Sequence, residues 1–108
     1  MNSESPARRM LGLWKTQVVP TIPDAVTMEI TFINLHQIEL VFIEVAPLHR
    51  GKGHGSAVLR QLTALADQTG VAVVLYPEQT AVERLQRFYE RFGFVTMDAG
   101  QSMRYQPK

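Results

Sequence analysis

Hydrophobic and polar positions alternate in two neighbouring stretches of the first half of the chain. Residues 26–35, VTMEITFINL, and residues 37–47, QIELVFIEVAP, are rich in β-branched and aromatic side chains with polar ones between them. This pattern is typical of strands with one buried face. A tight turn at residues 34–37 would join the two strands, so we expect an antiparallel hairpin that ends at Pro47.

The pattern changes to a helical period after Gly55. Apolar side chains recur at helical spacing at Val58, Leu62, Leu65 and Ala66. Gly70 follows in the position of a C-terminal cap, which ends the predicted helix. Residues 71–76, VAVVLY, are a continuous apolar run, as expected of a parallel strand that is covered on both faces. Strand, helix and strand together predict a right-handed crossover unit.

A second helix and a terminal hairpin complete the predicted domain. Thr80 and Glu83 have the spacing of a capping box. The helix after them has apolar positions at Val82, Leu85, Tyr89 and Phe92, and Gly93 ends it. Two short strands, FVTM and SMRYQ, flank a turn at residues 98–100. The predicted fold is an α/β domain with a mixed central sheet, two helices and the order β-β-α-β-α-β-β.

Composition places the chain among small globular domains. With 108 residues it can form one core, so we expect a single domain over residues 1–108, of which residues 1–12 form a flexible tail. Hydrophobic residues make up 45% and charged residues 19%, which excludes the disordered class. The chain has no cysteine and no apolar segment of signal-peptide or membrane-span length, so the cytoplasm is the expected location.

Glycine occupies alternate positions immediately before the first predicted helix. In HRGKGHGS, residues 49–56, the glycines are Gly51, Gly53 and Gly55, and Arg50 and Lys52 stand beside them. The free N–H groups and the dipole of a helix N-terminus attract anions, and glycine lets a phosphate approach the backbone. We therefore predict a phosphate-binding loop, with a flexible connector as the alternative. The Walker and dinucleotide-binding glycine patterns are both absent.

Two motifs in the correct order resemble those of the GNAT superfamily of N-acetyltransferases. From Arg50 the loop is similar to the family's acetyl-CoA pyrophosphate motif R/Q-x-x-G-x-G/A, and FYERFGF, residues 88–94, is similar to its later aromatic-Tyr and Gly-Phe motif. The resemblance covers about residues 26–106. It suggests a small, N-terminally shortened member, because few residues precede Val26 to form the strand and two helices with which the family begins. Val82 stands roughly where the family frequently has asparagine.

The resemblance implies transfer of an acetyl group from acetyl-CoA to a primary amine by direct attack on the thioester. It implies a cofactor site made of Ile43, Glu44, Val45, Arg50, Gly51, Lys52, Gly53, His54, Gly55 and Ser56. The pantetheine arm would pair with the strand edge at residues 43–45, and the thioester carbonyl would lie near the amide of Val45. Tyr89 matches the family's general acid. Glu39 is the first candidate for the general base, with Glu44 and an ordered water as alternatives.

The expected partners follow from this interpretation and from the charge. The acceptor is an amine of a small molecule, or a lysine or N-terminus of a protein. Eleven basic against ten acidic residues, a net charge of +1, argue against nucleic-acid and membrane partners, and the three histidines lack metal-ligand spacing. A homodimer could form through an edge strand at residues 102–106 or through Trp14 and its apolar neighbours. The alternative function is a non-catalytic CoA-binding module that acts as a sensor or an interaction platform.

Overall fold

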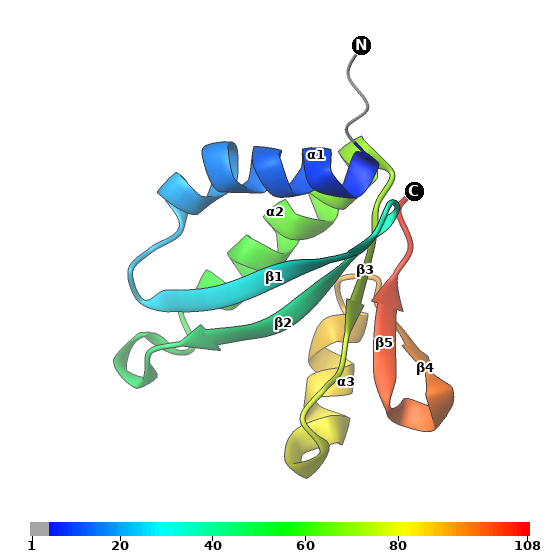
Figure 1. Ribbon diagram of the computed structural model, residues 1–108. Helices are drawn as coiled ribbons and strands as arrows, with labels where there is room; N and C mark the ends of the chain where they lie inside the picture. The colour runs from blue at the N-terminus through cyan, green and yellow to red at the C-terminus, as the bar shows by residue number, and fades with distance from the viewer. Residues whose placement is uncertain (1–4) are drawn as a thin grey trace.

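The computed structural model describes residues 5–108, which form one mixed five-stranded sheet with helices packed against it (Figure 1). The strands are β1 (Val26–Asn34), β2 (Gln37–Val45), β3 (Ala72–Leu75), β4 (Val95–Met97) and β5 (Ser102–Tyr105). The helices are α1 (Pro6–Leu13), α2 (His54–Thr69) and α3 (Val82–Glu90). The strands lie in the order β1-β2-β3-β5-β4. None of the helices in the described part is both long and apolar enough to cross a membrane.

Strand pairing confirms the predicted α/β fold and the order of its elements. Strands β1 and β2 are an antiparallel hairpin, and Asn34 pairs with Gln37 at its turn. Strand β3 pairs in parallel with β2 after the crossover through α2, which ends at Gly70 in the left-handed conformation, with φ +71°. Strand β5 pairs antiparallel with both β3 and β4. The structure adds α1, a third helix, to the two that the sequence predicts.

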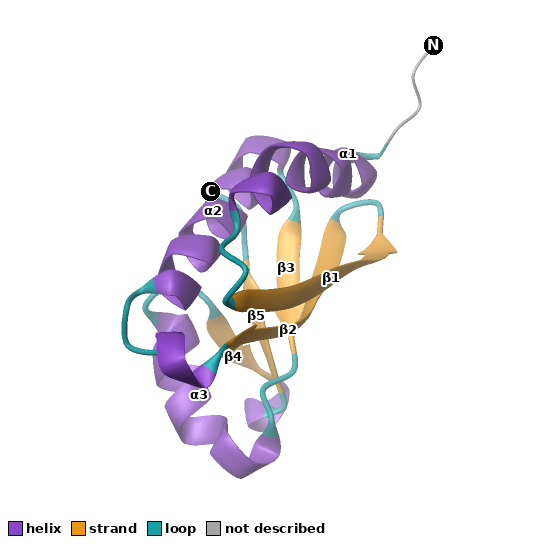
Figure 2. Ribbon diagram, turned by 90° about the vertical axis from the view of Figure 1, so that its left-hand side faces the viewer, coloured by secondary structure: helices purple, strands orange, loops and turns teal. Residues whose placement is uncertain are grey.

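The hydrophobic core lies on one side of the sheet. Helices α1, α2 and α3 lie on this side, and within residues 5–108 no helix covers the opposite face (Figure 2). Strand β1 shows the resulting alternation, because Met28 and Ile30 pack against the core whereas Thr27 and Glu29 are exposed. On β2, Phe42 remains 40% exposed. The hairpin therefore has one buried and one open face, as its alternating pattern predicts.

Residues 6–12 form a packed helix, so the prediction of a flexible tail is wrong for them. The Ser5 side chain accepts a hydrogen bond from the Arg8 N–H, and Pro6 occupies the first turn, where its missing N–H costs nothing. Ala7 and Met10 are fully buried in the main core. The helix gains its stability from this packing, which the short N-terminal pattern did not reveal. Residues 1–4 lie outside the described residues.

Both predicted dimer surfaces are internal in this structure. Trp14 is only 4% exposed and belongs to the core cluster. The predicted edge strand, residues 102–106, forms β5, which lies between β3 and β4 and has neighbours on both sides. Neither feature is available to a second copy, because one is buried and the other has its backbone groups paired.

The predicted capping box is also wrong. Thr80 lies inside a short 3-10 turn, Gln79–Ala81, and α3 begins only at Val82. Ala81 takes the capping position, and no side chain hydrogen-bonds to the start of the helix. The helix starts one residue later than a cap at Thr80 would place it, so Thr80 and Glu83 no longer have the relation that a capping box requires.

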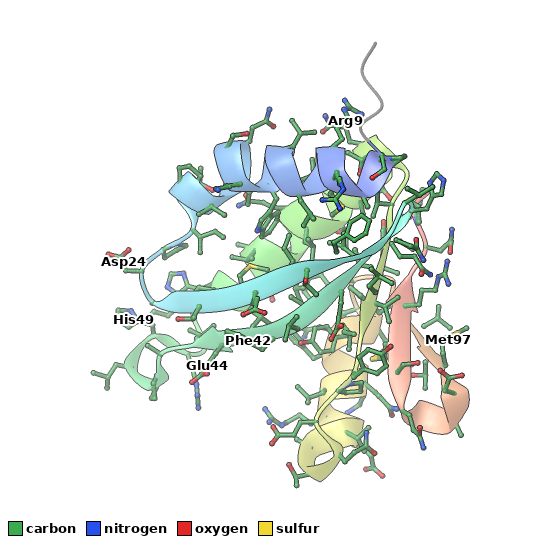
Figure 3. All side chains as sticks on the ribbon, viewed as in Figure 1. Arg9, Asp24, Phe42, Glu44, His49 and Met97 are labelled. Carbon is green, nitrogen blue, oxygen red and sulfur yellow. The ribbon has the colours of Figure 1, made fainter. Side chains whose placement is uncertain are left out.

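We predict that Met10→Ala strongly destabilises the protein. The side chain is fully buried, so its removal leaves a cavity, and the free energy of unfolding is expected to fall by about 3 kcal/mol. Arg9→Ala is the matched control, since Arg9 extends from the outer side of α1 (Figure 3) and is exposed. Urea denaturation measures both variants. Equal stability of the two variants would show that α1 does not pack on the core.

Candidate active site

Strands β2 and β3 part beyond their short paired region (Figure 1), and a cleft, which is the central feature of the site, lies where they separate. Their parallel pairing covers only residues 37–39 of β2 and residues 72–74 of β3. Beyond this point β2 continues beside β1 alone, while β3 stays paired with β5. The space between them is a cleft of about 980 Å³, which is also lined by the glycine loop and by α3.

A β-bulge in β2 coincides with the point of separation. Ile30 pairs with Leu40 and Glu29 pairs with Phe42, so Val41 is an extra residue without a partner on β1. A bulge bends its strand and increases the local twist. The bulge thus gives a local cause for the turning of β2 away from β3.

Part of the β2 backbone faces the cleft. The Ala46 N–H donates to the Ala25 carbonyl across the hairpin, at 2.8 Å. Because backbone groups alternate in direction along a strand, those of Ile43 and Val45 point away from β1 and toward the cleft. The Val45 carbonyl accepts a hydrogen bond from Arg50 Nε at 2.9 Å. Arg50 therefore fastens the end of the strand to the loop that follows it.

The glycine loop leads directly into α2. Gly51 and Gly53 have φ angles of +79° and +81°, in the left-handed region that other residues rarely adopt. Gly53 caps α2, and no side chain bonds to the start of this helix. The first N–H groups of α2 therefore lack acceptors within the helix. Together with Arg50 and Lys52, this arrangement fits an anion such as a phosphate.

Gly55 has a different role, because its φ is not positive. It lies in the first turn of α2, and a Cβ there would stand 3.7 Å from Val45 Cγ2 and 3.9 Å from Phe88 Cζ. Both are ordinary van der Waals distances. The glycine thus leaves space between Val45 on β2 and Phe88 on α3.

Tyr89 lines the cleft from α3 and is almost fully buried. The residue is 8% exposed, and its ring packs edge-on against Phe88 and Phe94, with centroid distances of 5.2 and 5.6 Å. Burial raises the pKa of Tyr89 above its ordinary value, so the hydroxyl keeps its proton at neutral pH. Within residues 5–108 no fully buried side-chain oxygen or nitrogen lacks a partner.

Most of the residues that the sequence predicts for the site line one cleft. They are Ile43, Glu44, Val45, Arg50, Gly51, Gly53, His54, Gly55, Ser56 and Tyr89. Lys52 is exposed and stands outside the lining. Residues that the sequence did not predict also line the cleft, among them Tyr76, Arg84, Phe88 and Arg91. Phe88 and Arg91 lie within the FYERFGF motif, which is the signal that could have identified them.

The two candidate bases occupy different positions. Glu39 is the last residue of β2 that pairs with β3, opposite Val74, and it does not line the cleft. Glu44 lines the cleft and is exposed near the loop end of β2 (Figure 3). His49 and His54 have ring centroids 6.2 Å apart. Among the residues that the structure describes, no group of three His, Asp and Glu side chains is placed to hold a metal ion.

We predict that the loop glycines differ in their effect on stability. Gly53→Ala puts a side chain at φ +81° and should lower the free energy of unfolding by about 1 kcal/mol. Gly55→Ala, the matched control, meets no clash in the first turn of a helix and should raise it by about 0.5 kcal/mol. Chemical denaturation of both variants measures the difference. Effects of the same sign would contradict the assigned backbone roles.

Comparison with solved structures finds the same fold in acetyltransferases. Ard1 from Thermoplasma volcanium is 18% identical, with a TM-score of 0.67 over 78% of this chain and 64% of its own. The PaiA N-acetyltransferase from Thermoplasma acidophilum, in complex with coenzyme A, is 14% identical, with a TM-score of 0.59 over 92% of this chain and 68% of its own. A structure from Corynebacterium glutamicum, described as histone acetyltransferase HPA2 and related acetyltransferase, is 17% identical. Its TM-score is 0.58 over 95% of this chain and 75% of its own.

The sequence itself gives the family. This chain spans 64% of the Ard1 chain and 58% of a nourseothricin acetyltransferase, so it is shorter than both. No curated protein sequence matches it. The model of the Acetyltransferase (GNAT) family matches residues 25–94, more than half of the chain and the region that contains the loop, the cleft and Tyr89. The chain therefore belongs to the Acetyltransferase (GNAT) family.

Proposed function

We propose that this protein is an acetyl-CoA-dependent N-acetyltransferase that transfers the acetyl group to a primary amine by direct attack. The observation that carries the proposal is the cleft between β2 and β3. It joins the bare helix start at Gly53, the free backbone edge of β2 and the protonated hydroxyl of Tyr89. An anion site, an edge for an amide chain and an acid are the groups that a CoA thioester requires.

The loop and β2 would hold the two parts of the cosubstrate. The N–H groups at the start of α2 would bind the pyrophosphate, with Arg50 adding charge at its rim. The pantetheine arm would lie along β2, where Ile43 offers its N–H and C=O. The Val45 carbonyl is already bonded to Arg50, and Val45 lies next to the loop. We therefore expect the thioester beyond Ile43, toward the bulge, rather than at the Val45 amide.

The chemistry needs two proton movements. An alkyl ammonium has an ordinary pKa near 10.4, so the acceptor must lose a proton before its nitrogen can attack the thioester carbonyl. The thiolate that leaves has an ordinary pKa near 8.5 and gains from a proton donor. Tyr89 would donate that proton. Glu39, at the point where the strands part, would accept the amine proton through a water molecule, with Glu44 as the alternative base.

The acceptor is proposed only as a class. It is a primary amine of a small molecule, or a lysine or N-terminal amine of a protein. The acceptor would reach the region where β2 and β3 part from the open face of the sheet, since the helices in the described part of the chain lie on the opposite face (Figure 2). A substrate entering from this side would meet the thioester from the side opposite α3.

Thermal unfolding tests the cosubstrate. Acetyl-CoA or CoA at about 100 times the dissociation constant should stabilise the fold by about 2.7 kcal/mol, which is a shift of several degrees, whereas ATP should have no effect. Gly53→Glu should abolish the shift, because it places a negative side chain in the anion loop. Gly70→Glu is the matched control, since Gly70 has a similar φ of +71° at the other end of α2. Absence of a shift in the natural protein would refute the proposed function.

Substitution of Tyr89 tests the acid. Tyr89→Phe keeps the buried ring, so the dissociation constant of CoA should stay within about twofold while kcat falls about 100-fold. Because burial raises the pKa of Tyr89 above its ordinary value of 10.0, its proton is lost only above that pH. The rate should therefore show no loss from this group between pH 7 and about 9.5.

The outcomes separate catalysis from binding alone. An unchanged kcat in Tyr89→Phe would remove Tyr89 from the mechanism. If the natural protein binds CoA but acetylates no amine in a broad panel, the protein is a CoA-binding module instead.

A further inference from the structure

The β1-β2 hairpin differs in charge from the rest of the chain. All eleven lysines and arginines lie outside residues 16–49, a segment that contains four acidic residues. Three of these four, Glu29, Glu39 and Glu44, belong to β1 and β2. The net charge of +1 for the whole chain therefore conceals an acidic region, which includes the β2 side of the cleft.

The register of the hairpin places the three glutamates on the open face of the sheet. Each forms a direct cross-strand pair; the pairs are Glu29 with Phe42, Thr31 with Glu39, and Thr27 with Glu44. Alternate positions of a strand share a face, so all three pairs lie on the side opposite the core. Glu29 and Glu39 are diagonal neighbours, and such residues are about 7–8 Å apart. Their like charges repel, and a ligand with two cationic groups relieves this repulsion.

An exposed aromatic ring stands beside the two carboxylates. Glu39 is half-buried at the point where β2 and β3 part, opposite Val74. Phe42 on β2 and Tyr76, immediately after β3, are 40% and 60% exposed, and both line the cleft. Because Phe42 pairs with Glu29, a chain that runs from Glu39 to Glu29 passes beside its ring. An alkyl chain can pack on such a ring, and the ring face attracts an ammonium group.

We propose that the acceptor is a small aliphatic diamine, and that Glu29 binds the ammonium group that does not react. The inference rests on the proposed function, because it assigns the acceptor of the same transfer. When the reacting nitrogen lies near Glu39, the second nitrogen of a molecule such as 1,5-diaminopentane reaches Glu29, since its two nitrogens have a similar separation. The carboxylate accepts a charge-assisted hydrogen bond from this ammonium group. A monoamine lacks the second contact.

Only one nitrogen of the diamine changes in the reaction. It attacks the thioester carbonyl, so that a C–N bond forms, the C–S bond breaks and CoA leaves as the thiol. The reacting ammonium group loses two protons in all. One is released to water through the base, and the other replaces the proton that Tyr89 gives to the thiolate. The second ammonium group keeps its protons and its contact with Glu29 throughout.

Steady-state kinetics with 1,5-diaminopentane and 5-aminopentan-1-ol test the inference, because a hydroxyl replaces one ammonium group at the same chain length. For the natural protein, kcat/KM per reacting nitrogen should be about 5- to 10-fold higher for the diamine. Glu29→Gln should reduce this ratio to about one. Glu29→Lys should invert it, because the new positive charge repels the second ammonium group. Glu83→Gln, the matched control, should preserve the ratio, since Glu83 is an exposed glutamate of α3 that does not line the cleft.

The outcomes separate failure of this inference from failure of the proposed function. Equal kcat/KM values for the two compounds in the natural protein would overturn the diamine assignment and leave acetyl transfer intact. An undiminished ratio in Glu29→Gln would overturn the role of Glu29. Acetylation of other amines but of neither test compound would also overturn the inference alone. If the natural protein acetylates no amine at all, the proposed function fails together with the inference.

Discussion

The separation of β2 from β3 is the constraint on which the rest of the site depends. A strand has backbone N–H and C=O groups along each of its two edges. Along one edge β2 pairs with β1 from Gln37 to Val45, apart from the bulge at Val41. On the other side it pairs with β3 only as far as Glu39. The remaining N–H and C=O groups then face a cleft that side chains only partly fill. An unpaired strand edge in this position favours a ligand with amide groups of its own.

The hydrophobic core, which lies on one side of the sheet, supports this cleft. The helices that the structure describes lie on one face of the sheet, where α3 packs its apolar side against the core, and this packing positions Tyr89. The ring contacts continue from Phe88 through Tyr89 and Phe94 to Tyr105 on β5. The Tyr105 hydroxyl donates to Asp67 on α2 at 2.8 Å. Burial first, and then the hydrogen bond and the charge of Asp67, raise the pKa of Tyr105 to about 12.

Arg50 and the three loop glycines contribute to the site in different ways. Arg50 begins the R-x-x-G-x-G pattern, yet one of its donors serves the protein itself by fixing the Val45 carbonyl. Gly51 and Gly53 provide the left-handed turns, whereas Gly55 provides space beside Phe88. The three glycines thus have different physical roles, although they look equivalent in the sequence. Lys52, the other basic residue of the loop, is exposed and does not line the cleft.

Local patterns predicted the elements that local forces determine. The alternation in residues 26–45 and the helical period after Gly55 follow from which face of each element is buried, so both appear in the sequence. The capping box at Thr80 failed because the chain inserts a short 3-10 turn before α3. The tail prediction failed because α1 is short and contains Gly12. Its stability comes from Met10 and its neighbours packing on distant elements.

The sequence by itself determined the family, the order of the strands and of the two helices α2 and α3, and the position of the glycine loop, because these depend on residue spacing and on the backbone freedom of glycine. Only the tertiary structure decided where β2 leaves β3, that Glu39 lies outside the cleft and that Trp14 is buried. These features arise from contacts between distant segments, and no local pattern in the chain records which segments will meet.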